Sequence, residues 1–351
     1  MRFYTGQHRY YCGIDLHART LYLCIVDAQG NVLLHKRLRC EPQALLHALD
    51  PYREDLVVCS ECIFCWYWLA DLCAREQIPF VLGHALYMKA IHGAKAKNDR
   101  IDAHKAAVLL RGGAFPVAYV YPPRMRATRD LLRRRLFFVR KRGELLAHVR
   151  NTFHQYNLPG PTGQLLYKKN REEVARLAQA FPDPVIPKTL AADLALADRY
   201  DPVIRELERT VEQEACVDDP VTFDRLRTIP GVGRILALTL LYEIHDIRRF
   251  STVQRFSSYC RLVKPEHRSG GKRVGSGGAK IGNVHLKWAF SEAAVLFLKD
   301  NARGQAHLQR LTRRHGKGKA LSILAARIGR ATYFMLNNSE DFDTERFYAK
   351  T

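Results

Sequence analysis

The sequence predicts an α/β domain at the N-terminus, followed by a mainly α-helical remainder. Three short apolar runs in the first 40 residues are separated by turn residues, a pattern typical of a strand meander. Helical and strand patterns then alternate, an order that collects strand ends at one edge of a sheet. Beyond residue 125 the apolar positions recur at helical spacing, so we expect helices there.

The elements of the first domain follow from these patterns. The expected strands are 10–14, 21–26, 32–38, 56–59 and 79–82. The expected helices are 43–49, 66–75 and a third that begins at Asp99, with Ala103, Ala106, Ala107, Leu109 and Leu110 on its apolar face.

The pattern of the remaining residues predicts long helices with three interruptions. A helix is expected over 132–153, then a proline-rich linker around 182–187, then an amphipathic helix over 190–211. Pro202 is expected to interrupt or restart this second helix, because proline lacks the N–H that a helix interior needs. From residue 222 the chain is again helical, broken by a turn at 230–233 and a glycine-rich stretch at 269–282.

Composition limits the function classes. The 351 residues are enough for two or three domains, and the hydrophobic content of 47% is ordinary for a globular protein. No apolar run approaches the length of a membrane span, and nine cysteines in a chain of this length do not predict a disulfide framework. We therefore expect a cytoplasmic protein. The formal charge of +21 points to nucleic acid as the partner, with a membrane surface as the weaker alternative.

The charges are arranged in blocks. Residues 124–150 hold ten Lys and Arg and two acids, residues 190–219 hold nine acids and three Arg, and residues 261–319 hold fourteen Lys and Arg and three acids. We assign the acidic block to protein packing or self-association, since phosphates would repel it. The first basic block is predicted to contact a nucleic-acid backbone, with a solvated surface as the alternative. Its expected contact residues are Arg133, Arg134, Arg140 and Lys141.

Four acids form the sharpest signal. Asp15 follows the first strand, Glu61 follows the fourth, and Asp99 and Asp102 lie three residues apart on one helix face. Hard oxygen ligands from strand ends and a helix suit two Mg²⁺ or Mn²⁺ ions that support phosphoryl transfer. Each acid taken singly could instead cap a turn or a helix, but their common placement at strand ends favours a metal site.

These residues also carry a family resemblance. Tyr11-Cys12-Gly13-Ile14-Asp15, Cys59-Ser60-Glu61 and Lys97-Asn98-Asp99-Arg100-Ile101-Asp102-Ala103 resemble the DEDD-type transposases of the IS110 insertion-sequence family. One departure is Cys62-Ile63-Phe64, where the family often has Ala-Thr-Gly. The resemblance implies a RuvC-like catalytic domain of RNase H type over 1–125. It also implies a helical, coiled-coil-like connector over 126–218 and a helical transposase domain with a serine nucleophile over 219–351.

The glycine-rich stretch is the second signal. Its composition predicts a flexible phosphate-binding loop, with Arg268, Lys272 and Arg273 as the neutralising cations. The resemblance implies that Ser269, in a Ser-Gly pair, is the nucleophile, with Ser276 as the competitor. Upstream, 228–233 resembles a helix-hairpin-helix turn whose Gly231 and Gly233 amides would contact a nucleic-acid backbone, and an ordinary tight turn is the alternative.

Two further patterns, one of cysteines and one of aromatic residues, are better explained by packing in the core than by a functional site. Cys59, Cys62 and Cys65, with Cys73 beyond, could ligate zinc or an iron–sulfur cluster, but no histidine follows at ligand spacing and buried thiols are favoured. The aromatic run 66–68 could stack on bases, but at a strand–helix junction it is better explained as core.

The resemblance implies a mobile-element transposase that binds donor and target DNA and a structured guide (bridge) RNA, and that acts as a dimer or tetramer in the prokaryotic nucleoid. Asp15, Glu61, Asp99 and Asp102 would hold Mg²⁺, and Ser269 would form a covalent phosphoserine with DNA during transposition. One alternative is a RuvC-like, metal-dependent junction-resolving nuclease. Another is a non-enzymatic basic nucleic-acid-binding protein.

Overall fold

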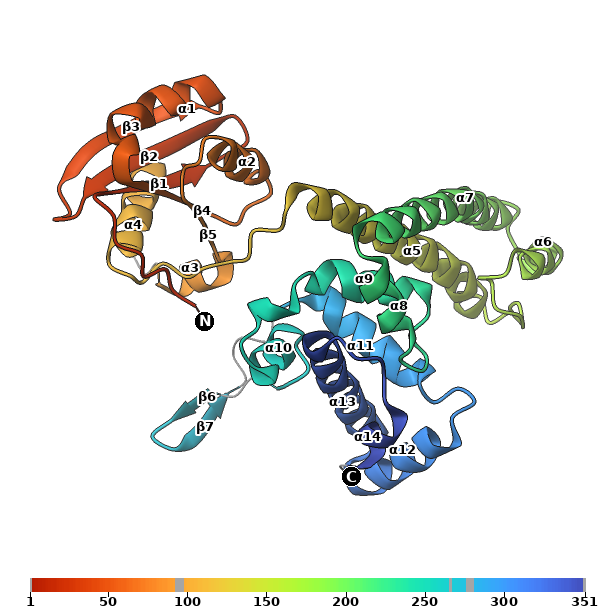
Figure 1. Ribbon diagram of the computed structural model, residues 1–351. Helices are drawn as coiled ribbons and strands as arrows, with labels where there is room; N and C mark the ends of the chain where they lie inside the picture. Colours follow the sequence, from red (N-terminus) through yellow and green to blue (C-terminus); the bar gives the residue numbers. More distant parts are fainter. Residues whose placement is uncertain (1, 92–97, 265–266, 276–280, 350–351) are drawn as a thin grey trace. The chain divides into compact units, whose positions relative to one another are not determined.

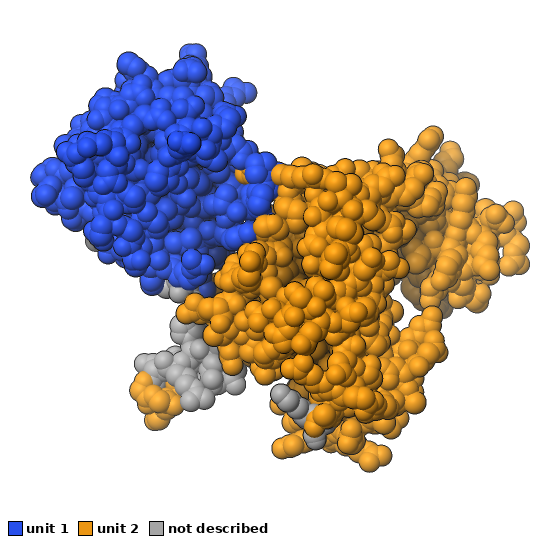
Figure 2. All heavy atoms as spheres, viewed as in Figure 1, with its two compact units in different colours: residues 1–123 blue, residues 124–351 orange. Residues whose placement is uncertain are grey.

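Two compact units make up the chain, residues 1–123 and residues 124–351 (Figure 2). The computed structural model describes residues 2–91, 98–264, 267–275 and 281–349. The first unit carries a five-stranded sheet, and the second is almost entirely helical (Figure 1). The predicted α/β domain and helical remainder are thus confirmed, whereas the expected boundary after residue 218 stays a prediction. Within the described ranges no helix is both long and apolar enough to cross a bilayer.

The sheet of the first unit has the order β3-β2-β1-β4-β5. Strands β1, β2 and β3 form an antiparallel meander, and β4 and β5 continue the sheet parallel to β1. The strands are β1 (Tyr10–Leu16), β2 (Thr20–Asp27), β3 (Val32–Arg39), β4 (Leu56–Glu61) and β5 (Phe80–Gly83). The helices are α1 (Pro42–Leu49), α2 (Tyr67–Arg75), α3 (Ala85–Ile91) and α4 (Asp99–Arg111), with a 3-10 turn at Asp50–Asp55.

Helices cover both faces of this sheet, because successive side chains of a strand point to opposite faces. Cys12 and Ile14 of β1 pack in one core with α1 and α2. Tyr11 of β1 and Cys59 of β4 pack in the other core with the alanines of α4. The odd-numbered residues of β1 and β4 therefore face α4.

The second unit begins with two antiparallel helices of 33 residues each, α5 (Pro123–Gln155) and α7 (Ile186–Asp218). Their apolar stripes meet in one buried cluster that includes Val149 and Ala197. Between them lie α6 (Glu172–Leu177) and short 3-10 turns at Lys168–Asn170 and Ala178–Ala180.

Ion pairs join the basic face of α5 to the acidic face of α7. Arg142 Nη1 lies 2.5 Å from Asp201 Oδ1, and Arg124 Nε lies 2.5 Å from Asp218 Oδ1. Arg135 likewise pairs with Glu208. The acidic block predicted to serve protein packing thus contacts the basic block of the same chain.

Pro202 does not interrupt α7, so that expectation is wrong. The helix runs through Pro202 from Ile186 to Asp218. Proline removes one backbone hydrogen bond to residue 198, but Ala197 on one side and Ile204 on the other are buried. Packing on both sides of the proline therefore outweighs the local cost.

The remaining helices pack around one large core. They are α8 (Pro220–Arg227), α9 (Arg234–Ile244), α10 (Val253–Tyr259), α11 (Val284–Leu296), α12 (Ala302–His315), α13 (Lys317–Asn338) and α14 (Thr344–Ala349), with a 3-10 turn at Ile247–Arg249.

The glycine-rich stretch is not simply a loop, which corrects the prediction. Strands β6 (His267–Ser269) and β7 (Lys272–Gly275) form an antiparallel hairpin. Gly270 and Gly271 have φ of 56° and 77°, the left-handed conformation that a two-residue hairpin turn needs at both positions. Ser276 lies outside the described residues.

Candidate functional site

Two of the predicted acids lie at the C-terminal ends of β1 and β4, which are adjacent and parallel. Ile14 of β1 is paired with Ser60 of β4, so Asp15 and Glu61 follow at the same level of the sheet. Both belong to the set of odd-numbered residues that face α4. The strands thus direct the two carboxylates toward one side of the sheet.

Helix α4 supplies the other two acids from its first turn. Asn98 caps the helix, because its side-chain oxygen accepts a hydrogen bond of 2.8 Å from the Ile101 N–H. Asp99 and Asp102 follow in the first turn. They are three residues apart and so lie on one side of the helix.

Gly13 allows α4 to pack directly on β1. A Cβ at Gly13 would lie 2.3 Å from the Ala103 oxygen and 2.4 Å from the Ala107 nitrogen, both backbone atoms of α4. Only glycine fits this approach. Because Gly13 is two residues before Asp15, the close packing also sets the distance between the strand end and the acidic turn of α4.

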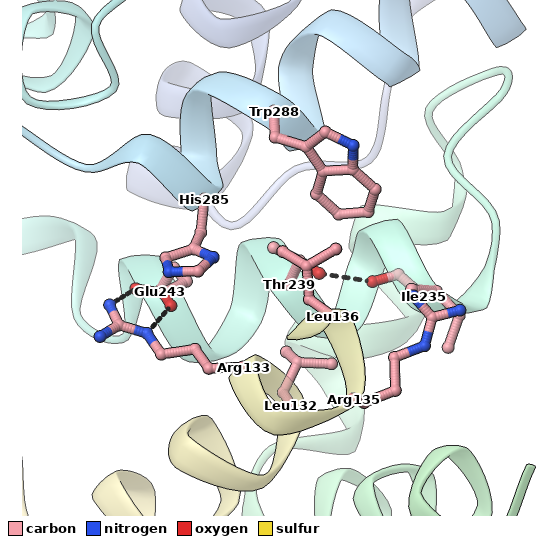
Figure 3. A pocket seen from close by; sticks show the side chains of 9 residues that line it. All are labelled: Leu132, Arg133, Arg135, Leu136, Ile235, Thr239, Glu243, His285 and Trp288. Carbon is pink, nitrogen blue, oxygen red and sulfur yellow. Dashed lines mark hydrogen bonds and ion pairs between the residues drawn. The ribbon is translucent and has the colours of Figure 1, made fainter. Parts of the chain in front are cut away.

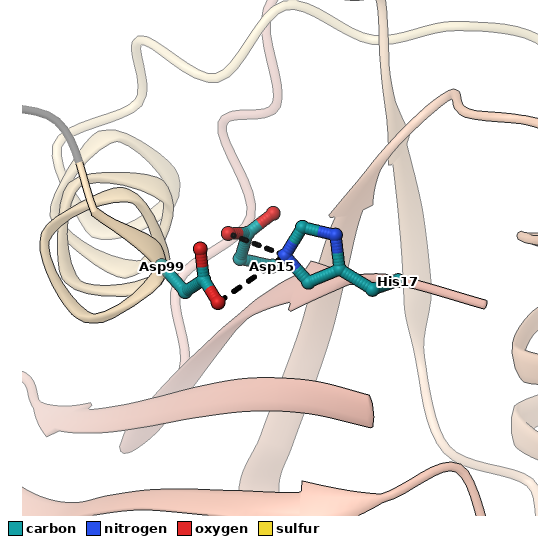
Figure 4. Close-up of side chains that lie close together, drawn as sticks. All are labelled: Asp15, His17 and Asp99. Atoms are coloured by element: carbon teal, nitrogen blue, oxygen red, sulfur yellow. Dashed lines mark ion pairs between the residues drawn. The ribbon is translucent and has the colours of Figure 1, made fainter. Parts of the chain in front are cut away.

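The close packing brings Asp15 and Asp99 to a common point (Figure 4). His17 Nε2 lies 3.5 Å from Asp15 Oδ2 and 3.4 Å from Asp99 Oδ2. One ligand atom from each of the three residues lies within 4.8 Å of the others. Of the described residues, Glu61 and Asp102 are outside this group; Asp102 lies on α4 with Asp99, and Glu61 ends β4, the strand next to β1.

His17 is a site residue that the sequence does not predict. A weak signal exists, because Asp15 and His17 are two residues apart and such residues share a face of a strand. The backbone N–H of His17 donates to the Thr20 oxygen at 2.9 Å, so the turn after β1 fixes the position of the imidazole.

The donor set fits a divalent cation. Carboxylate oxygens suit Mg²⁺ and Mn²⁺, and an imidazole nitrogen is acceptable to Mn²⁺. The side chains of Asp15 and Asp99 are 23% and 48% exposed, so an ion and a phosphate could reach them from solvent. Asp15, Asp99 and His17, with Glu61 and Asp102 beside them, are the residues that would hold the ion.

The cysteines near Glu61, all of them among the described residues, do not form a second metal site. Cys59 packs in the core on the α4 face of the sheet, and Cys73 packs in the core on the opposite face. Burial raises the pKa of Cys73 to about 12 and raises the pKa of Cys59 as well, which disfavours the thiolates that zinc needs. Trp66, the first aromatic of the run 66–68, is buried in the same core as Cys73.

The second candidate region is the hairpin that carries Ser269. Ser269 is the last residue of β6 and is paired with Lys272 across the turn. The hairpin belongs to the stretch between Tyr259 and Asn283, here called the serine segment. Two hydrogen bonds hold the ends of the serine segment together at its base. The backbone N–H of Asn283 donates to the Tyr259 oxygen at 2.6 Å, and Arg261 Nε donates to the Gly282 oxygen at 3.1 Å.

A buried carboxylate anchors this base (Figure 3). Glu243 of α9 is 1% exposed and accepts hydrogen bonds from Arg129 Nε at 3.0 Å and from Arg133 Nε at 2.6 Å. Asn283 Nδ2 donates to the same carboxylate at 2.7 Å, and Asn283 Oδ1 caps α11 by accepting from the His285 N–H at 2.9 Å. Glu243 thus joins α5, α9 and the residue that closes the serine segment.

Electrostatics hold this anchor in its charged form. Burial alone raises the pKa of Glu243, but the hydrogen bond from Arg133 and the charges of Arg129 and Arg133 outweigh it and lower the pKa to about 2. The neighbouring cavity measures about 10 Å³, about the size of one water molecule, so it is not a ligand site.

The predicted nucleic-acid residues have different environments. Arg133 is bound to Glu243, and Lys141 Nζ lies 2.7 Å from Glu144. Arg134 and Arg140 are exposed on α5, and Lys272 is exposed on β7. Arg268 of β6 and Arg273 of β7 are paired across the hairpin. Nucleic-acid contact by these residues stays a prediction.

The two predicted glycines, Gly231 and Gly233, lie in the turn between α8 and α9 and have different surroundings. Gly231, at φ 79°, packs on the end of α11, where an added Cβ would lie 2.4 Å from the Phe297 nitrogen. Packing therefore explains Gly231. Gly233 is the N-cap residue of α9, and an added Cβ there would have no heavy atom within 4 Å. Packing therefore does not explain why this position is a glycine.

A mixed sheet with carboxylates gathered beside the ends of its parallel strands defines a class of protein, the metal-dependent enzymes that act on nucleic-acid phosphates. Two family profiles match the chain within this class. A DEDD-type transposase profile of IS110 matches residues 12–158, and the Transposase IS116/IS110/IS902 family matches residues 223–309.

Two curated relatives align with most of the chain. The transposase for insertion sequence element IS1111A of Coxiella burnetii is 22% identical over 334 residues, which is 94% of this chain and 90% of the relative. The transposase for insertion sequence element IS1328 of Yersinia enterocolitica is 24% identical over 299 residues, which is 82% of this chain and 83% of the relative.

The chain belongs to the IS110 family of transposases, enzymes that recombine the DNA of mobile elements. Its first unit has the RNase H-like fold of the family's DEDD domain, and membership of a DEDD family indicates dependence on a divalent metal.

Proposed function

We propose that this transposase cuts and rejoins DNA through a covalent phosphoserine at Ser269, with Mg²⁺ held by Asp15, Glu61, Asp99 and Asp102. The observation that supports the proposal is that Asp15 and Asp99 both lie beside His17, while Glu61 ends the strand next to β1 and Asp102 shares the first turn of α4 with Asp99. A bound Mg²⁺ would neutralise the scissile phosphate and stabilise the charge that develops on it.

The chain's own residues supply the remaining chemistry. The Ser269 hydroxyl attacks phosphorus, the Oγ–P bond forms, and the bond from phosphorus to a DNA sugar oxygen breaks. The serine proton ends on the departing sugar hydroxyl. A second sugar hydroxyl reverses the step on a new strand, so no ATP is needed because the phosphodiester energy stays in the serine ester.

The glycine turn supports this role for the hairpin. Gly270 and Gly271 hold Ser269 beside a two-residue turn, and no atom lies within 4 Å of an added Cβ at either glycine. The backbone of the turn next to Ser269 is therefore open to a DNA strand. We further propose that the carboxylates come from one copy of the chain and Ser269 from another, in a dimer or in a tetramer on DNA.

Site choice is the second part of the proposal. We infer that a structured guide RNA encoded by the mobile element pairs with donor and target DNA in the bacterial cytoplasm, at the nucleoid. The protein then reads backbone and shape, and base pairing reads sequence. Recombination of donor and target DNA by purified protein should require RNA transcribed from the element's noncoding flank, and equal recombination after RNase treatment would refute guidance.

The serine chemistry is tested by trapping the protein on nicked donor DNA and denaturing it. A covalent protein–DNA adduct is expected with the wild-type chain and with Ser276→Ala, but not with Ser269→Ala. Metal-dependent hydrolysis that survives Ser269→Ala without any adduct would instead establish a junction-resolving nuclease. Unchanged activity in Asp15→Asn would remove the metal from the account and favour a binding protein.

A further inference from the structure

A strongly basic surface lies at the turn between α12 and α13. Arg310, Arg313 and Arg314 lie in the last two turns of α12, and Lys317 and Lys319 lie in the first turn of α13. All five side chains are exposed. These five residues are called the α12–α13 cations.

The sequence on either side of these cations holds no acidic residue. No Asp or Glu occurs between Asp300 and Glu340. In the part of the chain that the structure describes, the ion pairs of the acids after residue 339 join Glu340 to Arg346, Asp341 to Arg225 and Glu345 to Arg303, and none includes an α12–α13 cation. The basic face of α5 differs, because several of its arginines pair with acids of α7.

Folding alone does not explain this arrangement. Cations are favourable at the C-terminal end of α12, where the helix dipole is negative. Lys317 and Lys319 have the opposite placement, because the N-terminal end of α13 is positive and its first turn holds no acid. Arg310 also has like charges three and four residues away, which repel it on the helix surface.

The backbone of the turn is open to a large partner. An added Cβ at Gly316 or Gly318 would have no heavy atom within 4 Å. Gly316 adopts φ 78°, which glycine tolerates, and it reverses the chain between the two helices. The turn thus has an unobstructed backbone and lies between three exposed arginines of α12 and two exposed lysines of α13.

Helix α13 connects this surface to the base of the serine segment. Gly329 packs on Leu262, whose Cδ1 would lie 2.3 Å from an added Cβ, and Leu262 is five residues before β6. From Lys317 to Gly329 the helix rises about 18 Å at 1.5 Å per residue. That length corresponds to about five base pairs of a DNA duplex.

We propose that the α12–α13 cations bind the phosphate backbone of the DNA substrate. DNA is chosen because the chain is a transposase and because five exposed cations are complementary in charge to a phosphate backbone. The inference rests on DNA being the substrate and does not require the serine chemistry.

The test measures binding of full-length protein to a short DNA duplex of random sequence over a series of salt concentrations. Every chain carries Ser269→Ala, so that strand exchange cannot contribute and failure of the serine proposal leaves the measurement intact. The test variant is Arg310→Gln/Arg313→Gln/Arg314→Gln. Its control is a triple arginine-to-glutamine variant of exposed α7 residues, Arg199, Arg205 and Arg209.

The test variant should bind the duplex on the order of tenfold or more weakly, and its salt slope should fall by about one for each phosphate that the missing arginines would neutralise. The control should bind as the parent does. Equal binding by both triple variants would overturn the proposal. Unchanged duplex binding together with abolished binding to a structured RNA would also overturn it, and would assign the surface to RNA.

Discussion

Replacing Gly13 with alanine tests whether the acids depend on the close packing of α4 on β1. The added methyl carbon would lie 2.3 Å from the Ala103 oxygen and 2.4 Å from the Ala107 nitrogen. Attractive contacts between such atoms begin near about 3.5 Å. Because both neighbours are backbone atoms and cannot rotate away, α4 must move out by roughly 1 Å.

This displacement has two measurable consequences. Overpacking of this kind costs about 1–3 kcal/mol in the free energy of unfolding. A shift of about 1 Å in the groups that hold a reacting phosphate costs on the order of 100-fold in rate. Gly13→Ala should therefore remain folded, while its metal-dependent DNA cleavage falls by about two orders of magnitude.

Gly143→Ala is the matched control. Gly143 lies within α5, and an added Cβ there has no heavy atom within 4 Å. This variant should gain about 0.5–1 kcal/mol in the free energy of unfolding and keep full cleavage. Urea denaturation and a cleavage time course measure both quantities. Full cleavage by Gly13→Ala would show that the acids do not depend on the close packing of α4 on β1.

Three further predictions concern the two candidate regions. Glu243 has a pKa of about 2, whereas the ordinary value is 4.5. Its charged form therefore adds about 3 kcal/mol to the free energy of unfolding above pH 4.5, and this contribution is lost as the pH falls toward 2. Glu243→Gln should remove this pH dependence and cost about 3–5 kcal/mol by removing the buried negative charge beside Arg129 and Arg133, as urea denaturation across pH would show. Asn283→Ala should cost about 1 kcal/mol and also slow adduct formation. His17→Ala should weaken Mn²⁺ binding by about 10- to 100-fold in calorimetry.

Each of these three has a control or a contradicting result. Asn301 caps α12 with the same chemistry, so Asn301→Ala should cost similar stability without slowing adduct formation. His47 lies exposed on α1, over the other face of the sheet, and His47→Ala should keep its Mn²⁺ affinity. If the stability of Glu243→Gln followed the wild-type pH curve, the charge on Glu243 would not stabilise the fold.

The positions of the four acids, at two strand ends and in one helix turn, follow from local rules in the sequence. Strand alternation and strand order put Asp15 and Glu61 on one face, and helical spacing pairs Asp99 with Asp102. His17 could not be predicted with the same ease. Its contact with Asp99 depends on the turn after β1 and on how closely α4 approaches at Gly13, and both are tertiary features.

Features of the second unit depend still more on tertiary contacts. The opposite charges of α5 and α7 are visible in the sequence, but only the antiparallel register pairs Arg142 with Asp201. Pro202 is a local helix breaker that buried neighbours override. The paired glycines at 270 and 271 fit a hairpin turn as well as a loop, and pairing of the flanking strands decides between them.

A crystal structure with Mn²⁺ and anomalous diffraction data tests the metal site most directly. We expect an anomalous peak at coordination distance from carboxylate oxygens of Asp15 and Asp99, with Glu61 or Asp102 completing the shell. A structure in which Mn²⁺ binds elsewhere and no ion lies between Asp15 and Asp99 would show that these acids do not form the metal site.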